Sequence, residues 1–133
     1  MREADTLVAE YARRLGRFAT VGTKAYRDEA ALLKAIGAGK ANPVVVLLDA
    51  RGKQFSSEGF AKWLGAKRDQ GVREAWFAVG PADGWSDAAR AQAGMVWSLG
   101  EMTLAHELAR VVMAEQVYRA MTILEGHPYH GGH

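Results

Sequence analysis

The last third of the sequence concentrates side chains that can hold an ion or move a proton. Glu115 and Arg119 are four residues apart with the acid first, which is the favourable order for an ion pair on one face of a helix. Tyr129 and His130 follow in the sequence. The Arg119 cation can stabilise an anion, and the imidazole of His130 can accept a proton. The same stretch also carries His106, Arg110, Tyr118 and His127. These residue types indicate either a site for proton chemistry or an ordinary solvated helix face.

The histidines could also be read as a metal site. His127, His130 and His133 have the spacing H-x-x-H-x-x-H. They lie in a glycine-rich end beyond the last predicted helix, and no matched acidic ligand follows them. Because nothing obvious in the sequence holds this end in place, we expect no metal site there.

One long helix must position these groups, and the sequence predicts it from about Leu104 to Glu125. Thr103 is a suitable N-cap residue for its start. Gly126 stands where a left-handed residue ends many helices, and Pro128 just beyond prevents continuation.

The apolar side chains of this predicted helix point in two directions. At 100° per residue, one side carries Leu104, Leu108 and Val111. The nearly opposite side carries Met113, Val117 and Leu124. One side can pack on the chain's own sheet, and in a chain of 133 residues the other needs a partner, which a second copy supplies most simply. We therefore predict a homodimer with this helix at its interface.

The first forty residues predict two helices with a strand between them. Apolar residues with helical spacing run over Leu7–Leu15, where Asp5 can cap a helix and Gly16 can end it. The short, β-branched segment Phe18–Thr23 favours a strand, and a second helix is expected over Arg27–Ile36.

Three further strands should form the core sheet. Pro43–Leu48 is a continuous apolar run with three valines, which is typical of a central parallel strand covered on both faces. Ala75–Val79 and Met95–Leu99 are the next two. The connections between them contain helices that can be capped by Ser56 or Ser57 and by Ser86.

This alternation indicates a single α/β domain over residues 1–133, with a mostly parallel sheet flanked by helices. In such sheets ligands bind beyond the carboxyl ends of the strands. The loops after Leu48, Val79 and Leu99 are therefore the expected binding site, and the first of them is expected at Asp49–Lys53.

Composition and charge narrow the class of protein. The chain is 49% apolar and 24% charged, as globular domains are, and it has no cysteine, which excludes thiol chemistry and fits a cytoplasmic location. No apolar run is long enough to cross a membrane, and neither G-x-G-x-x-G nor a P-loop is present. The net charge is +2, but residues 1–73 carry +6 and residues 74–133 carry −4. The basic half could attract a polyanion, or its long side chains could simply solvate exposed helices.

The order of residues near the end is more informative than their types. Met102 to Ala120 reads M-T-L-A-H-E-L-A-R-V-V-M-A-E-Q-V-Y-R-A, and H-P-Y-H follows. This run closely resembles the C-terminal signature of the RlmH family, which belongs to the SPOUT class of ribosomal RNA methyltransferases. The resemblance extends more weakly back to about Asn42.

The resemblance implies a SPOUT-type trefoil knot at the C-terminus and a site for S-adenosyl-L-methionine in the three loops. At the matching positions the cofactor residues are Leu48, Gly80, Pro81, Gly100, Glu101, Met102, Thr103, Leu104 and Ala105. Relatives usually have two glycines where this chain has Gly80 and Pro81, and a proline in place of Ala105. They also begin with a short strand for which this sequence has no residues, so either its start is truncated or misassigned, or the sheet tolerates one strand fewer. Because proline lacks an amide donor and fixes φ, the contact at Pro81 should be reshaped.

The resemblance also implies the reaction, which is methylation at N3 of a pseudouridine in 23S ribosomal RNA, on assembled ribosomes. A homodimer is implied, and neither a membrane nor DNA is expected as a partner. Because the sulfonium methyl is already activated, such an enzyme must mainly hold donor and acceptor in line. The imide proton must leave, and we expect Arg119, Tyr129 and His130 to assist that step.

Two alternative functions stay open at this stage. The chain could be a non-catalytic RNA-binding module that has lost the cofactor through Pro81 and the missing strand, or an α/β enzyme outside the SPOUT class that binds a small nucleotide. If RNA binds, the expected phosphate contacts are Arg51, Lys53, Lys67 and Arg68.

Overall fold

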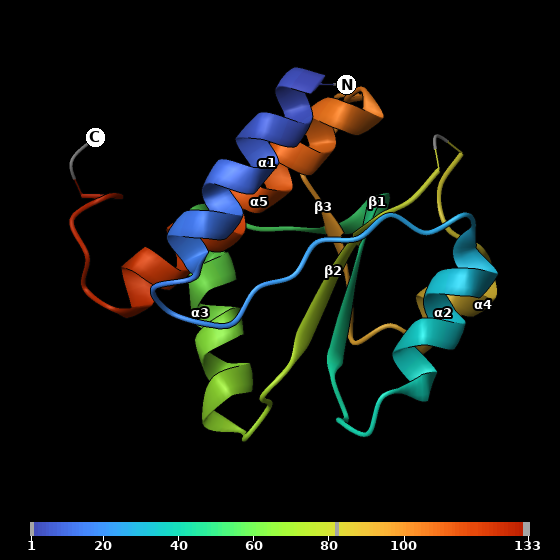
Figure 1. Cartoon of the computed structure of the whole chain (residues 1–133), viewed down its shortest axis with the longest axis horizontal. Helices are drawn as coiled ribbons and strands as arrows, with labels where there is room; N and C mark the ends of the chain where they lie inside the picture. Colours follow the sequence, from blue (N-terminus) through green and yellow to red (C-terminus); the bar gives the residue numbers. More distant parts are fainter. Residues whose placement is uncertain (1, 82, 132–133) are drawn as a thin grey trace.

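A computed structural model describes residues 2–81 and 83–131, and that part of the chain forms five helices and three strands (Figure 1). In chain order they are α1 (Arg2–Leu15), α2 (Glu29–Ala38), β1 (Val44–Gln54), α3 (Ser57–Asp69), β2 (Ala75–Val79), α4 (Asp87–Gln92), β3 (Met95–Ser98) and α5 (His106–Leu124). This order confirms the predicted α/β class. Among the described residues, no helix has the length and apolar character needed to span a membrane.

The sheet is parallel, and β1 lies at its centre in the order β2-β1-β3. The apolar run of β1 suits this position, because Val46 and Leu47 are 1% and 0% exposed. Leu48 lies beside Val79 of β2 and beside Trp97 of β3. The prediction of a central strand beginning near Pro43 is therefore confirmed.

β1 is longer than predicted. The residues expected as a loop, Asp49–Lys53, continue the strand to Gln54, and pairing with β3 resumes where Lys53 lies beside Trp97, after a shift in register. The shift brings Gly52 so close to β3 that a Cβ atom there would lie 2.6 Å from the carbonyl carbon of Val96. The polar stretch is thus a bulged strand end, which the close approach of the two backbones restricts to glycine at this position.

Helices cover both faces of the sheet in two groups (Figure 1). On one face α1 and α3 both pack against α5, over a core in which Phe60 stacks on Trp97 with ring centres 4.1 Å apart. On the other face α2 and α4 enclose a smaller core around Leu47 and Trp85. The two cores hold the sheet between them and fix the loops at its carboxyl edge.

The segment Phe18–Thr23 was predicted as a strand, and this prediction is wrong. The structure places it in an irregular connection between α1 and α2. The ring of Phe18 lies against the end of α5, 6.5 Å from the ring centres of both Tyr118 and His127. Phe18 is half-buried there, whereas residues 19–23 are exposed, so this ring packs on a helix instead of pairing at a sheet edge.

Two helix starts also differ from expectation. α1 begins at Arg2, so Asp5 lies within its first turns and is not an N-cap. α2 begins at Glu29, two residues later than predicted, because the side chain of Asp28 caps it by accepting a hydrogen bond of 2.8 Å from the backbone N–H of Ala31.

α5 begins at His106, later than the predicted Leu104. Ala105 is at the N-cap with no side-chain hydrogen bond, so Thr103 lies in the preceding loop and the prediction that it caps the helix is wrong. At the other end Gly126 has a φ of 69°, which confirms the predicted left-handed residue.

The two apolar sides of α5 have different surroundings. Val117 and Ala120 are buried in the chain's own core. Leu108 is 51% exposed and Val112 is 36% exposed, and both follow the exposed Leu104 along the helix. The chain therefore covers one side of α5 and leaves an apolar strip on the other.

Candidate active site

The segments predicted to bind a ligand after Leu48, Val79 and Leu99 lie close together, although the first of them, Asp49–Lys53, continues β1 instead of forming a loop. Leu48 is in register with Val79 and with Trp97, so the strand ends lie next to one another. Gly80 follows β2 directly, and the loop from Leu99 to Ala105 follows β3. The predicted cofactor positions on different strands are thus brought to the same edge.

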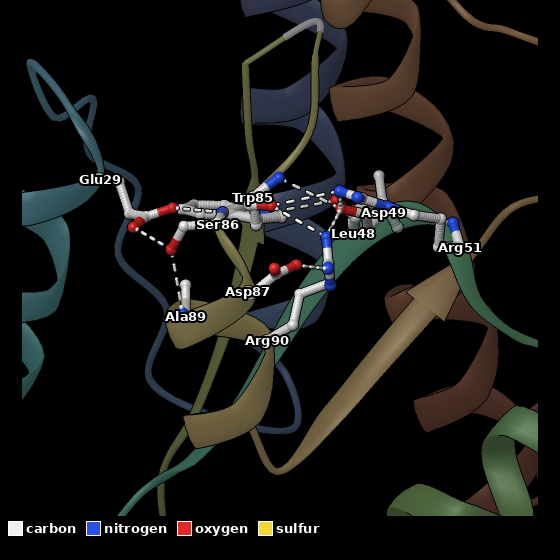
Figure 2. A network of polar contacts seen from close by, with 9 residues as sticks. All are labelled: Glu29, Leu48, Asp49, Arg51, Trp85, Ser86, Asp87, Ala89 and Arg90. Carbon is white, nitrogen blue, oxygen red and sulfur yellow. Dashed lines mark hydrogen bonds and ion pairs between the residues drawn. The ribbon is translucent and has the colours of Figure 1, made fainter.

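A buried carboxylate organises the first two of these loops (Figure 2). The side chain of Asp49 is 2% exposed, and its Oδ1 accepts hydrogen bonds of 2.9 Å from the backbone N–H and from Nε of Arg51. Its Oδ2 accepts from Nη2 of Arg51 at 2.9 Å and from the backbone N–H of Trp85 at 3.1 Å. The Arg51 guanidinium holds the pKa of this carboxyl well below its usual range. Asp49 is therefore a charged anchor that ties β1 to the loop after β2.

Trp85 fills the space between the two strand ends (Figure 2). It is 4% exposed, and its Nε1 donates a hydrogen bond of 2.9 Å to the carbonyl of Leu48. Its ring lies against Gly80, where a Cβ atom would come within 2.6 Å of Cε2. Two predicted cofactor residues, Leu48 and Gly80, are thus positioned by the same indole ring.

The loop after β2 is also fixed at its far end. Ser86 caps α4, and Glu29 of α2 accepts from the Ser86 hydroxyl at 2.6 Å and from its backbone N–H at 2.9 Å. Arg90 donates to the carbonyl of Trp85 at 3.0 Å and pairs with Asp87. Pro81 is exposed at the surface of this loop, and its carbonyl accepts from the N–H of Gly84 at 2.9 Å in a tight turn.

The last loop is exposed to solvent along most of its length. It begins at Gly100, whose φ of 137° is readily adopted only by glycine, and Ser98 Oγ accepts from the Gly100 N–H at 3.2 Å. The remaining residues are exposed, and they are Glu101, Met102, Thr103, Leu104 and Ala105. Because α5 has no side-chain cap, its first N–H groups can bind a polar ligand that enters this loop.

The three predicted catalytic residues lie together beyond the end of α5. Arg119 donates to Glu115 through Nη2 at 2.7 Å and through Nε at 3.1 Å, as their spacing predicted. Its Nη1 lies 2.8 Å from Nδ1 of His130, and its guanidinium lies 4.9 Å from the ring centre of Tyr129. The hydroxyl of Tyr129 donates to Glu115 at 2.6 Å. The tail therefore folds back on α5 and forms a cluster, which we call the tail cluster.

The contacts assign a protonation state to each member of the tail cluster. Burial raises the pKa of the Tyr129 phenol, and its hydrogen bond to Glu115 raises it further, so the hydroxyl stays protonated at neutral pH. Burial alone would raise the pKa of Glu115, but the hydrogen bonds from Arg119 and Tyr129 outweigh it and the carboxylate stays ionised. Since guanidinium only donates, Nδ1 of His130 acts as an acceptor there, and its Nε2 faces Glu58 at 3.5 Å.

A cleft of about 230 Å³ separates the tail cluster from the last loop, and we call it the Gln116 cleft. Its polar lining consists of Gln54, Ser57, Ser98 and Gln116. Its other lining residues are Phe55, Phe60, Trp97, Leu99, Gly100 and Val112. Ser57 donates to Oε1 of Gln116 at 2.7 Å, and Nε2 of Gln116 donates to Glu115 at 2.9 Å. Hydrogen bonds thus run from the cleft into the tail cluster.

The histidines that suggested a metal site have other contacts. Nδ1 of His127 accepts from the backbone N–H of Tyr129 at 3.2 Å. Nδ1 of His130 faces Arg119, as described above. His133, the third member of the spacing, lies outside the described residues.

The four cations proposed to bind phosphate differ in their surroundings. Arg51 is engaged by the buried Asp49 and by the carbonyl of Trp85, and Arg68 pairs with Glu125 at 2.8 Å. The ammonium groups of Lys53 and Lys67 lie over aromatic rings, those of Phe55 and Trp63. Arg51 is therefore better explained as part of the Asp49 anchor than as a phosphate contact.

Sequence reasoning missed the residues that support the site from behind. Asp49 was considered only as part of a loop, and Trp85 and Gln116 were not considered. For Asp49 a signal was present, because an acid that follows directly on a buried apolar strand must find a partner. For Trp85 and Gln116 we find no such signal, since their partners lie 37 and 59 residues away in the chain.

Comparison with known proteins shows the family to which the chain is similar. Residues 1–130 match the family described as "Predicted SPOUT methyltransferase". A protein of Koribacter versatilis named "Ribosomal RNA large subunit methyltransferase H" is 54% identical over 130 residues, which cover 97% of this chain and 89% of that protein. A protein of the same name from Deinococcus radiodurans is 47% identical over 129 residues, with 92% of this chain and 86% of that protein covered.

Proposed function

This chain belongs to the SPOUT methyltransferase family, and from this we propose that it transfers a methyl group from S-adenosyl-L-methionine to N3 of a pseudouridine in 23S ribosomal RNA. The observation that carries the proposal is the tail cluster of Arg119, Tyr129 and His130, which hydrogen bonds through Glu115 and Gln116 connect to a cleft that begins at the predicted cofactor loop. Both relatives named above carry large-subunit ribosomal RNA in their names. Assembled ribosomes in the cytoplasm are the expected setting.

The cofactor would be held by the three loops at the sheet edge. Leu48 and Gly80 offer backbone groups beside the fixed ring of Trp85, and Gly100 to Ala105 offer an exposed loop with the uncapped start of α5 behind it. When bound, S-adenosyl-L-methionine supplies a methyl group on a sulfonium. Because Pro81 is exposed and donates no backbone hydrogen bond, the contact at this position must come from its carbonyl or its ring.

The tail cluster would handle the proton of the acceptor. Methylation at N3 breaks the N3–H bond, and the negative charge that develops on the imide needs a cation beside it. Arg119 meets this need, since Glu115 and Tyr129 hold its side chain and leave it 16% exposed. The imidazole of His130 could accept the proton at Nδ1 once the Arg119 guanidinium turns from that nitrogen to the imide, because Nδ1 is the ring nitrogen that acts as an acceptor.

We also propose that two copies of the chain associate through α5. Leu108 and Val112 form an exposed apolar strip on this helix, and the exposed Met102 and Leu104 extend it in the loop before the helix. A second copy would cover the strip and with it the mouth of the Gln116 cleft, which Val112 lines. The trefoil knot of the family is expected within the same C-terminal part of the chain.

The basic half of the chain would attract the RNA. With Arg51 held by Asp49, Lys53 and Lys67 become the leading candidates for phosphate contacts, which position RNA without reading its bases. Affinity should then fall steeply as the salt concentration rises.

Titration calorimetry with S-adenosyl-L-methionine tests the proposal at its first step. The wild type should bind, and Thr103→Trp, which fills the last loop, should not. A wild type that does not bind the cofactor but does bind ribosomal RNA would instead support the alternative function, a non-catalytic RNA-binding module. Undiminished binding by Thr103→Trp would place the cofactor away from this loop.

A further inference from the structure

The Gln116 cleft has the chemistry of a site for a neutral heterocyclic ring. None of the described residues that line it carries a charge. Its walls are aromatic and aliphatic, with two amides and two hydroxyls among them. Pockets with a mostly apolar lining and a few placed polar groups are typical of small-molecule sites. A phosphate or an amino-acid zwitterion would find no opposite charge here, whereas a neutral base would find both apolar walls and hydrogen-bonding groups.

The size and position of the cleft favour the acceptor base over the cofactor. Drug-sized ligands occupy roughly 300–1,000 Å³, and about 230 Å³ suits a single ring better than a whole nucleoside with its amino-acid arm. Leu48 and Gly80, the cofactor positions on the other two strands, are not among the described lining residues. The cleft lies instead between the start of the last loop, at Gly100, and the tail cluster, through Gln116.

The amide of Gln116 is held in one orientation and keeps hydrogen-bonding capacity. Its Oε1 accepts from Ser57 at 2.7 Å and its Nε2 donates to Glu115 at 2.9 Å. An amide oxygen has two lone pairs and an amide nitrogen two hydrogens. Within the described part of the chain, these contacts therefore leave one lone pair and one N–H of the same amide for a ligand.

That pair matches the edge by which pseudouridine differs from uridine. In pseudouridine the ring is joined to the sugar through carbon, so N1 carries a hydrogen next to the carbonyl at C2. In uridine N1 is bonded to the sugar and offers no donor. An amide can pair with the N1–H and the C2 carbonyl at once, as glutamine and asparagine pair with two adjacent groups of adenine. N3 would remain unpaired and open to methylation.

We propose that the Gln116 cleft receives the acceptor base and that Gln116 selects pseudouridine by pairing with its N1–H and C2 carbonyl. This inference rests on the proposed function and adds the residue that sets its specificity. Ser57 acts as a positioning residue, because it fixes the amide. Glu115, the neighbour of Gln116 on α5, joins the amide to Arg119, so the ring edge that is read and the groups that handle its proton belong to one hydrogen-bonded unit.

The test compares methyl transfer to two kinds of ribosome, one with pseudouridine at the acceptor position and one with uridine, prepared from cells that lack the pseudouridine synthase for that site. We expect the wild type to prefer pseudouridine. Gln116→Leu should lower kcat/KM on the pseudouridine ribosomes by about 10- to 100-fold, the range for losing one bidentate base contact. Uridine keeps the C2 carbonyl but offers no N1–H, so transfer to the uridine ribosomes should fall by less, and the preference for pseudouridine should shrink. Ser57→Ala should reduce the preference in the same direction but by less.

Gln54→Leu is the matched control, because it removes the other amide that lines the same cleft and should leave the preference unchanged. An unchanged preference in Gln116→Leu, or a loss of preference in Gln54→Leu alone, would overturn the assignment. If Gln116→Leu is inactive on both kinds of ribosome, Ser57→Ala takes its place in the comparison. An unchanged preference for pseudouridine in Ser57→Ala would then overturn the assignment. A loss of S-adenosyl-L-methionine binding in Gln116→Leu, measured by calorimetry, would assign the cleft to the adenine of the cofactor and refute the inference while leaving the proposed function intact. A wild type with no transfer to either ribosome would refute both.

Discussion

Replacing Asp49 by asparagine should destabilise the protein, although the two side chains have nearly the same shape. The carboxylate accepts four hydrogen bonds, three from Arg51 and one from Trp85. An asparagine side chain can accept only through its oxygen, and its NH₂ group would face donors of Arg51 and Trp85. The variant therefore loses the ion pair between Asp49 and Arg51, and the NH₂ group of its asparagine faces N–H donors where the Asp49 carboxylate accepted hydrogen bonds.

The size of the effect follows from the exposure of the two partners. Removing one member of a buried ion pair costs roughly 3–5 kcal/mol. Asp49 is 2% exposed but Arg51 is 54% exposed, so water can recover part of the loss at the guanidinium. We expect a loss of about 2 kcal/mol in the free energy of unfolding, which for a domain of this size lowers Tm by about 6–10 °C.

Thermal unfolding followed by circular dichroism measures this change, with Asp69→Asn, at an exposed position, as the control. The pH dependence gives a second test. Because the folded pKa of Asp49 is lowered, its contribution is fully present above the unfolded value of about 3.9 and is lost as pH falls toward the folded value. The difference in stability between wild type and Asp49→Asn should therefore narrow below about pH 4. A Tm equal to that of the control, or a difference independent of pH, would refute the anchoring role.

Three further predictions concern the reaction and its partners. Arg119→Ala should lower kcat by about 100-fold or more, because it removes a group that stabilises developing negative charge. His130→Ala should also lower kcat, and calorimetry should show unchanged S-adenosyl-L-methionine binding in both variants. Wild-type turnover in His130→Ala would mean that the tail has only a structural role. Leu108→Glu should convert a dimer to a monomer in light scattering, and a wild type that is already a monomer at micromolar concentration would contradict the proposed interface. Lys53→Ala combined with Lys67→Ala should weaken RNA binding and flatten the slope of log affinity against log salt by about 1.4–1.8; an unchanged slope would place the phosphate contacts elsewhere.

Periodicity was sufficient to predict most of the framework. The apolar run at Pro43–Leu48 identified the central strand because a strand covered on both faces needs apolar residues at successive positions. Ser56 or Ser57 was predicted to cap one helix and Ser86 another, because a hydroxyl before a helix satisfies its first N–H groups. Ser56 and Ser86 do so in the structure. These features depend on neighbours in the chain, which a sequence displays directly.

The errors arose where contacts between distant segments decide the local structure. Asp49–Lys53 looks like a loop by composition, yet β3 pairs with its end and Gly52 permits the close approach. Phe18–Thr23 has the composition of a strand, but Phe18 packs on α5 instead. Thr103 could cap a helix, yet α5 starts at His106, after the last loop.

In the candidate site, too, features that depend on neighbouring residues were predictable, and features that depend on distant contacts were not. Glu115 and Arg119 were predictable as a pair from their spacing, and the family signature led to Tyr129 and His130. The supports behind them were not predictable, because Trp85 reaches Leu48 and Ser57 reaches Gln116 only through the packing of the sheet and α5.

Mass spectrometry of 23S ribosomal RNA can show directly whether the protein methylates N3 of a pseudouridine. Ribosomes that contain pseudouridine but lack its methyl group would be incubated with the protein and with S-adenosyl-L-methionine carrying a deuterated methyl group. We expect one labelled methyl group on a pseudouridine, located at N3 by fragmentation, and its near-complete loss with Arg119→Ala. Label on another nucleotide, label on ribosomal protein, or no label from a wild type that binds the cofactor would contradict it.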